Sequence, residues 1–405
     1  MRTRQVISAS MAVLALSSLV AACGEGPGAG AAGVQSSGEG VPQYAYDATW
    51  PRLPLPNQWI FGEVGGIGVD RRGRHIWVIQ RPWTVSGREL AAVEGEAECC
   101  RPAPPVIEFD AEGNVVQAWP ELRQFFAGPG TSAGQGFSIG GEGQTLWEAT
   151  DGPGYGEWGR REHTVYIDHD DFIWVTVDAS HLIYKFTRSG EHVLTIGEPG
   201  MTSGSNHTGH LGRPAGLVVD PETNELFVAD GYTNKRVIVF DGESGEYRRH
   251  WGAYGNRPED IQLDFDPDAA PPQQFVGPVH GIDLSTDGLI YVSDRRANRI
   301  QEFERDGTFV REAFVSPETR DLGTAYGVAL SKDPGQQWVF VNDGSNNKIW
   351  ILRRSDMEVV GSFASYGRSG GQVMSAHSMV VDYENNVYVG ETRGRRVQKF
   401  AIQGM

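Results

Sequence analysis

The sequence predicts an all-β protein, a six-bladed β-propeller whose ring is closed by an N-terminal strand. Its 405 residues include 53 glycines and 22 prolines, a composition that suits many short strands and turns better than long helices. A pattern of strand, turn and strand recurs six times along the chain, and the last copy stops after three strands. Six such units, each completed to four strands, are typical of a propeller.

The first 23 residues are interpreted as an export signal. Arg2 and Arg4 precede the apolar stretch 6–20, which is short for a membrane span, and "LVAAC" ends the segment at Cys23. This ending resembles the lipobox of bacterial lipoproteins, which implies lipidation of Cys23 and anchoring to the cell envelope, at the outer membrane where one exists. An ordinary cleaved signal with an incidental cysteine is the alternative.

Residues 24–43 are rich in glycine, alanine and serine and are interpreted as a flexible linker, with the propeller in residues 44–405. The formal net charge of −17 argues against a nucleic-acid partner, because such a surface repels a phosphate backbone. Adjacent Cys99 and Cys100 are predicted to form a vicinal disulfide, with free thiols or a metal site as alternatives.

Each repeat consists of an apolar strand, a turn, a second strand ending near an aspartate, another turn and a strand ending in an aromatic or apolar residue. The copies span residues 65–81 with 103–119, then 162–186, 214–240, 279–303, 325–352 and 376–400. Asp-Gly and Asn-Asn pairs supply the turn chemistry. We expect residues 49–61 to provide the missing outer strand of the last unit and so leave no open edge. An open solenoid is the alternative architecture.

Histidines occupy one position of every second repeat. The position lies five residues before the turn residue that ends the first strand of each repeat. In repeats one to six it holds, in order, Gly65, His163, Ala215, His280, Tyr326 and His377. About one residue in forty of this chain is histidine, so chance explains the alternation poorly. Alternate members of a six-fold ring form a triangle, and three histidines with an open fourth position are the ligand set of a catalytic zinc. Three unrelated core histidines, or a separate metal pair at His207 and His210, are the alternatives.

The repeats resemble NHL repeats over residues 60–400. The stretch "FVADGYTNKR" with its flanks is similar to the lyase domain of peptidylglycine α-amidating enzymes, which is a six-bladed propeller of this type. The resemblance implies that the three histidines hold zinc and that Tyr232 is the general base. It also implies that Arg81 and Arg295 face the same channel mouth and bind a substrate carboxylate, a role that suits the arginine fork. The alternatives are a structural Tyr232 and a salt bridge from Arg295 to Asp294.

Three positions depart from the family pattern. Ser378 stands where the family has an aspartate that helps to bind calcium, so a calcium site is doubtful. Ser375 replaces a methionine, although Met374 lies beside it. Thr233 replaces a cysteine of a family disulfide. The expected cofactor is zinc, with calcium doubtful.

The resemblance implies cleavage of an α-hydroxyglycine carbinolamide to an amide and glyoxylate, acting on a small molecule or peptide. Zinc would activate the α-hydroxyl oxygen, and no organic cofactor is needed. Two other classes remain open: a non-catalytic NHL propeller that binds partners at the cell surface, and a metal-dependent hydrolase such as a lactonase. Lactonase-like sites use carboxylate and amide ligands for calcium, which the histidine pattern does not match.

Overall fold

A computed structural model describes residues 34–36, 40–92, 95–119, 161–320 and 322–404. All of these residues lie within one unit of the chain, residues 31–405. The predicted signal segment and its Cys23 fall outside the described residues and stay predictions. No helix in the described part of the chain is long and apolar enough to cross a membrane.

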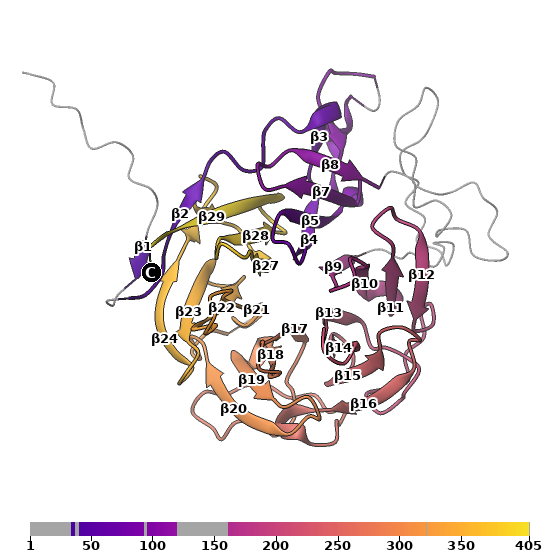
Figure 1. The fold of residues 1–405 in the computed structure, drawn as a ribbon, viewed down its shortest axis with the longest axis vertical. Coiled ribbons are helices and arrows are strands. Elements are labelled where there is room, and N and C mark those ends of the chain that lie inside the picture. The colour runs from indigo at the N-terminus through magenta and orange to yellow at the C-terminus, as the bar shows by residue number, and fades with distance from the viewer. Residues whose placement is uncertain (1–33, 37–39, 93–94, 120–160, 321, 405) are drawn as a thin grey trace, which may run out of the picture. The chain divides into compact units, whose positions relative to one another are not determined.

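Six antiparallel sheets surround a common axis as the blades of a propeller, which confirms the predicted fold class (Figure 1). Blade one contains β4 (Glu63–Val69), β5 (His75–Arg81), β7 (Val106–Asp110) and β8 (Val115–Ala118); blade two contains β9 (Glu162–Ile167), β10 (Ile173–Val177), β11 (Leu182–Phe186) and β12 (His192–Ile196). Blade three contains β13 (Pro214–Val219), β14 (Glu225–Asp230), β15 (Arg236–Asp241) and β16 (Tyr247–Trp251); blade four contains β17 (Val279–Leu284), β18 (Ile290–Asp294), β19 (Arg299–Phe303) and β20 (Phe309–Phe314). Blade five contains β21 (Gly327–Leu330), β22 (Trp338–Asp343), β23 (Lys348–Arg353) and β24 (Glu358–Phe363); blade six contains β27 (Ala376–Val381), β28 (Val387–Glu391), β29 (Arg396–Gly404) and β2 (Gln43–Asp47).

Short elements fill the connections between these strands. Two small parallel pairs join β3 (Trp59–Ile60) to β6 (Arg101–Pro102) and β25 (Ser365–Tyr366) to β26 (Gln372–Val373). The described helices are single 3₁₀ turns: η1 (Pro56–Gln58), η2 (Pro82–Thr84), η3 (Gly87–Leu90), η4 (Asp178–Ser180), η5 (Ala253–Gly255) and η6 (Arg295–Ala297).

An N-terminal strand closes the ring, but residues 49–61 are not that strand. Gln43–Asp47 pairs with β29 and completes blade six, so the predicted domain boundary at residue 44 falls inside β2. Residues 49–61 contain three prolines, which lack the N–H that a ladder needs. They cross the seam instead, where the Trp50 ring contacts Tyr388 of blade six and Phe109 of blade one. Closure by β2 rules out the open solenoid.

Part of the segment interpreted as a linker also joins a sheet. Residues 34–36 form β1 (Val34–Ser36), which pairs with β24 at the outer edge of blade five. The outer edges of two neighbouring blades are therefore covered by consecutive N-terminal strands. This arrangement leaves fewer unpaired backbone groups at the rim.

The hydrophobic core is divided among the blade interfaces. Each of six clusters of buried side chains lies between two neighbouring blades, including the pair formed by the last blade and the first. Between blades one and two, for example, Trp119 makes edge contacts with Trp77 and Phe186. Alternate residues of a strand point to opposite faces, so the central strands of a blade are apolar on both faces.

The inner strands approach one another closely around the axis. A Cβ atom at Gly281 of blade four would lie 2.5 Å from the Cα of Gly327 in blade five, so only glycine fits there. A cavity of about 140 Å³ runs between the inner strands, and all three predicted zinc ligands line it. The glycines thus bring the first strands near enough for their side chains to meet at the axis.

Polar side chains at the ends of second strands fix the loops that lead into the inner strands. Backbone N–H groups of Gly62, Gly212, Gly277 and Met374 donate to the side chains of Gln80, Asp230, Asp294 and Glu391 at 2.6 to 2.7 Å. This contact explains the recurring acidic residue of the repeat. In these four blades it holds the chain just before the inner strand, near the position that is histidine in alternate repeats.

Candidate metal centre and its arginine cluster

The three predicted ligands lie together at the propeller axis. His163 comes from β9, His280 from β17 and His377 from β27, and each side chain is at least 93% buried. Their ring centres are 4.7, 4.7 and 5.1 Å apart. Their ligand atoms all lie within 4.8 Å of one another.

Each imidazole is held by the main chain of the next blade. His163 Nδ1 lies 2.9 Å from the carbonyl oxygen of Ala215, and His377 Nδ1 lies 2.8 Å from that of Gly65. His280 Nδ1 makes the same contact with the carbonyl oxygen of Tyr326. A carbonyl can only accept, so each Nδ1 carries the proton and each Nε2 of a neutral ring keeps its lone pair. This is the tautomer that a metal ligand requires.

The environment keeps these imidazoles neutral. Burial, with the neighbouring His280, His377 and arginines, holds the pKa of His163 well below its usual value. Burial and the nearby His377 and Arg295 lower the pKa of His280 in the same direction. Burial and Arg81 lower the pKa of His377 to about 3. Neutral rings with free lone pairs are ready to bind a cation.

These donors fit a divalent transition metal. Three Nε2 lone pairs converge, each backed by a hydrogen bond from Nδ1, which matches the open three-histidine sites of catalytic zinc. In the described part of the chain, no other group of three His, Cys, Asp or Glu side chains is placed to hold a metal ion.

Tyr232 reaches the same point from blade three. It follows Gly231, where a Cβ atom would lie 2.1 Å from the backbone of Val279, so the loop is pressed against blade four. The Tyr232 hydroxyl lies 3.2 Å from His163 Nε2 and 3.0 Å from His280 Nε2. Because both nitrogens carry lone pairs, the hydroxyl donates to one of them. The phenol oxygen is thus adjacent to the metal-binding atoms.

Arg295 adjoins this tyrosine. Its Nη1 lies 3.5 Å from the Tyr232 hydroxyl, and its Nε donates to the carbonyl of Leu322 at 3.1 Å. The salt bridge to Asp294 considered from the sequence does not form, because that carboxylate pairs with Arg299 and caps the preceding loop. The guanidinium of Arg295 is therefore directed at the site.

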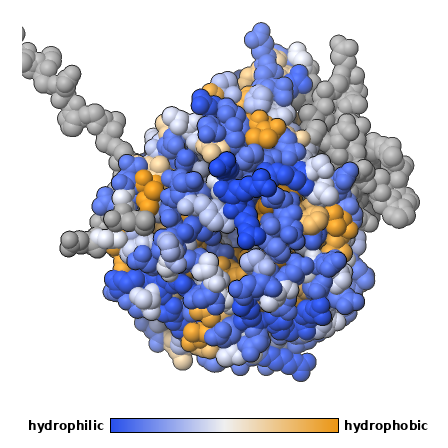
Figure 2. Space-filling model, in the orientation of Figure 1, coloured by the Kyte–Doolittle hydropathy of each residue, from blue (hydrophilic) through white to orange (hydrophobic). Residues whose placement is uncertain are grey.

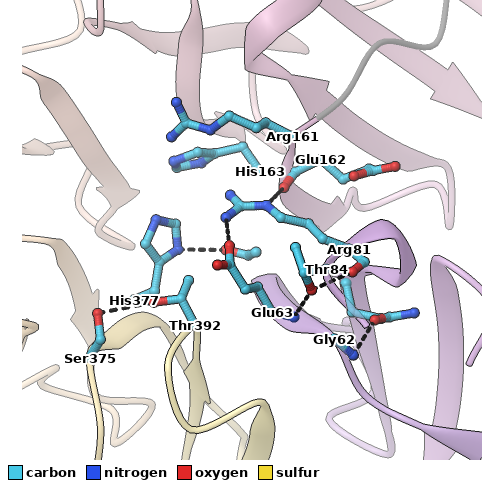
Figure 3. Close-up of polar contacts among 12 residues, drawn as sticks. Gly62, Glu63, Arg81, Thr84, Arg161, Glu162, His163, Ser375, His377 and Thr392 are labelled. Carbon is cyan, nitrogen blue, oxygen red and sulfur yellow. Dashed lines mark hydrogen bonds and ion pairs between the residues drawn. The ribbon is translucent and has the colours of Figure 1, made fainter. Parts of the chain in front are cut away.

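Arg81 lies on the opposite side, between blades one and two. Its Nε donates to the Glu162 carbonyl at 3.0 Å and its Nη1 to the Glu63 carboxylate at 2.7 Å (Figure 3). Its buried Nη2 has no hydrogen-bond partner among the described residues. One N–H edge of Arg81 is thus free for a ligand near His163 and His377.

Sequence reasoning missed two arginines and an aspartate beside Tyr232. Arg161 and Arg213 lie with their guanidinium carbons 5.0 and 5.1 Å from the centre of the Tyr232 ring. Both pair with the buried Asp178, which follows β10. Each arginine stands two residues before the histidine position of its repeat, at 163 and 215. Both arginines come directly before an inner strand, β9 or β13, so their shared place in the repeat was the available signal.

Two other sequence expectations concern loops. The sulfur atoms of Cys99 and Cys100 lie at bonding distance from each other. His207 and His210 stack with ring centres 4.0 Å apart, and His207 Nδ1 accepts backbone N–H groups of the same loop. That nitrogen is used internally, so the pair does not present two free lone pairs to a metal.

The comparisons with known proteins agree with this architecture. The family described as "NHL repeat" matches residues 211–240, which is most of blade three. A streptogramin B lyase structure aligns with a TM-score of 0.50 at 11% identity, covering 89% of this chain and 98% of that one. At this identity the likeness shows the fold alone.

Curated relatives include amidating enzymes of animals. The mouse (Mus musculus) peptidyl-glycine alpha-amidating monooxygenase is 28% identical over 250 residues, which cover 59% of this chain and 23% of that protein. The Drosophila melanogaster peptidyl-alpha-hydroxyglycine alpha-amidating lyase 1 is 25% identical over 406 residues, covering 91% of this chain and 66% of that protein. The chain spans less than two thirds of the length of either relative. The chain is a six-bladed β-propeller with a match to the NHL repeat in its third blade and a distant sequence similarity to the amidating lyases, and its buried three-histidine set is able to hold a metal ion.

Proposed function

We propose that the protein is a zinc-dependent lyase that cleaves an N-acyl-α-hydroxyglycine into an amide and glyoxylate. The observation that carries this proposal is the Tyr232 hydroxyl, placed 3.2 and 3.0 Å from the Nε2 atoms of two converging histidines. A phenol oxygen that can exchange a proton, held beside a metal-binding set, is suited to the removal of a hydroxyl proton. The sequence similarity to amidating lyases supports the same chemistry.

The metal site and Tyr232 would act on the substrate hydroxyl. A zinc ion bound by the three histidines supplies Lewis acidity to the α-hydroxyl group. Tyr232, acting as the phenolate, would take the hydroxyl proton; the α-oxygen would form the carbonyl as the C–N bond breaks, and the leaving amide nitrogen would take that proton, so the products are the amide and the aldehyde glyoxylate. The positive guanidinium of Arg295, 3.5 Å from the Tyr232 oxygen, stabilises negative charge on that oxygen.

Arg81 would hold the substrate carboxylate. Its Glu63 and Glu162 contacts fix the guanidinium, and its free Nη2 edge remains for an anion. Charge-assisted hydrogen bonds of this kind orient a carboxylate as well as bind it. The α-carbon of the substrate would then lie between Arg81 and Tyr232, near all three histidines.

Metal analysis and glyoxylate release test the proposal together. The purified protein should hold one zinc per chain, and His163→Ala, His280→Ala and His377→Ala should each lose most of it. His207→Ala, a change at an exposed histidine, should keep the full amount. The zinc-loaded protein should release glyoxylate from α-hydroxyhippurate. A folded, metal-loaded protein that releases none would leave a propeller that binds partners without catalysis.

The expected location of the protein is also a proposal. If Cys23 is lipidated, Cys23→Ser should move the protein from the membrane fraction to a soluble or unprocessed pool. Unchanged fractionation would count against the lipid anchor and leave the catalytic proposal unaffected.

A further inference from the structure

Three guanidinium groups surround one tyrosine ring at the mouth of the site. The guanidinium carbons of Arg161, Arg213 and Arg295 lie 5.0, 5.1 and 5.7 Å from the centre of the Tyr232 ring. Arg161 and His163 are two residues apart, and both side chains lie beside Arg81 (Figure 3). The proposed reaction uses Arg295 and Arg81 but gives Arg161 and Arg213 no task.

Arg161 and Arg213 carry two positive charges, and the one carboxylate that they share, Asp178, can balance only one of them. Among the described residues, Asp178 is the one carboxylate that pairs with Arg161 or Arg213, and both arginines approach its Oδ2, at 3.4 and 3.2 Å. Burial raises the pKa of Asp178 against the lowering effect of the two arginines. In a chain of net charge −17, two arginines sharing one acid oxygen form a local positive site.

Both arginines keep donors available to a ligand. Their side chains are 33% and 30% exposed, whereas Asp178 beneath them is fully buried. The buried Nε of Arg213 has no acceptor in the described part of the chain. Figure 2 shows that hydrophilic residues cover most of the face that it draws, with a strongly hydrophilic group near the centre. Asp178 therefore holds the two groups from below and leaves their outer N–H edges open.

We propose that Arg161 and Arg213 form a second anion-binding subsite, which takes a carboxylate on the acyl portion of the substrate. This inference rests on the proposed lyase function and names its substrate class: N-acyl-α-hydroxyglycines whose acyl group is itself acidic. Arg81 holds the carboxylate shared by all α-hydroxyglycines, and the Arg161–Arg213 pair selects those with a second one. The Tyr232 ring, which both guanidiniums cover, separates this subsite from the reacting hydroxyl.

A matched pair of substrates tests the subsite. N-benzoyl-α-hydroxyglycine and its 3-carboxybenzoyl analogue differ only by one carboxylate. The wild-type protein should show a kcat/KM on the order of 10-fold or more higher for the acidic analogue, as a charge-assisted hydrogen bond allows. Arg161→Gln or Arg213→Gln should raise KM for the acidic analogue about 10-fold and change the benzoyl substrate little.

Further variants separate the subsite from bulk charge and from misfolding. Arg296→Gln removes an exposed charge near the same mouth and should keep the preference. Arg161→Lys retains the charge over Asp178 and should lose part of the preference while staying folded. Equal losses for both substrates in Arg161→Gln would mean that the pair binds the shared carboxylate, and the proposal would be wrong.

Direct binding distinguishes failure of the subsite from failure of the lyase. Calorimetry should show that benzene-1,3-dicarboxylate binds the metal-loaded protein about 10-fold or more tightly than benzoate, and that Arg213→Gln removes the difference. This result would support the subsite even if neither substrate released glyoxylate. Equal affinity of the two anions for the wild-type protein would overturn it.

Discussion

A substitution of Tyr232 can separate metal binding from proton transfer in this site. Its hydroxyl contacts the Nε2 atoms of His163 and His280, and its ring lies beneath three guanidinium groups. It supplies none of the three convergent nitrogens. A change that deletes only the hydroxyl therefore leaves the ligand set complete.

Tyr232→Phe should abolish most turnover and leave zinc bound. The ring and its cation–π contacts remain, so the fold should be unchanged. Loss of an acid–base group typically lowers the rate by about 10² to 10⁴. Measured on α-hydroxyhippurate, kcat should fall by that factor while the zinc content stays at the wild-type value.

Tyr326→Phe is the matched control. Tyr326 is a buried tyrosine of the same ring, with its ring centre 5.8 Å from that of His280, but its contact with that histidine is made by its carbonyl oxygen. Deleting its hydroxyl should change kcat only a few-fold. Similar losses in the two variants would remove the argument for Tyr232 as the base.

The sequence predicted the residues whose position in the repeat is exceptional. Three histidines stand where the alternate repeats have Gly65, Ala215 and Tyr326, and that contrast is visible without a structure. Arg161 and Arg213 escaped because single arginines near turns are common, and their shared partner Asp178 lies in the turn after β10, apart from both in the sequence. Only the folded chain brings the three together.

At the scale of the element, the strand that closes the ring shows what the local sequence pattern can predict about strand pairing and what it cannot predict. Counting the strands of the sixth repeat showed that its outer strand was missing. The count could not show which segment supplies that strand, because Gln43–Asp47 is a short alternating segment next to a Gly-rich stretch, whereas residues 49–61 are more apolar. The pairing partner, β29, lies more than 350 residues away in sequence.

Tyr44 and Tyr46 of β2 give a test of this closure. Tyr44 is 3% exposed and stacks on Phe363 with ring centres 4.6 Å apart, whereas Tyr46 is 37% exposed. Tyr44→Ala should lower the free energy of unfolding by about 3 to 5 kcal/mol, as for other buried aromatics. Tyr46→Ala, two residues further along the same strand at a more exposed position, should change it by less than about 1 kcal/mol.

Urea denaturation of the two variants measures the difference. Tyr44→Phe serves as a further control, because the buried Tyr44 hydroxyl has no partner among the described residues and its loss should cost little. Equal destabilisation by the two alanine changes would show that β2 does not pack into blade six in solution.

At the scale of the whole molecule, the site depends on the alternation of blades around a closed ring. Even blades contribute the imidazoles, and odd blades contribute the carbonyl groups that orient them, from Gly65, Ala215 and Tyr326. The contact of His377 with Gly65 spans the seam between the last blade and the first. The metal centre therefore exists only when the ring is closed, and its three neutral imidazoles are buried by folding.

This burial makes the stability of the metal-free protein depend on pH. The folded-state pKa of His163 and His280 lies well below the usual 6.5, and that of His377 is about 3. Below pH 6.5 the unfolded chain binds protons at these residues that the folded protein does not, so the free energy of unfolding falls as the pH is lowered. Between pH 7 and pH 5 each histidine should contribute a loss of about 2 kcal/mol.

A variant with all three histidines replaced by glutamine isolates that contribution. Glutamine is neutral and of similar size, and the other ionisable groups are common to both proteins. With a chelator present, urea denaturation at pH 7, 6 and 5 should show a steeper loss of stability for the wild-type protein than for the triple variant. The difference should vanish above pH 7, where free imidazole is neutral in both states. Parallel pH profiles would mean that the imidazoles are not held neutral at the axis, and the proposed preorganisation of the metal site would be wrong.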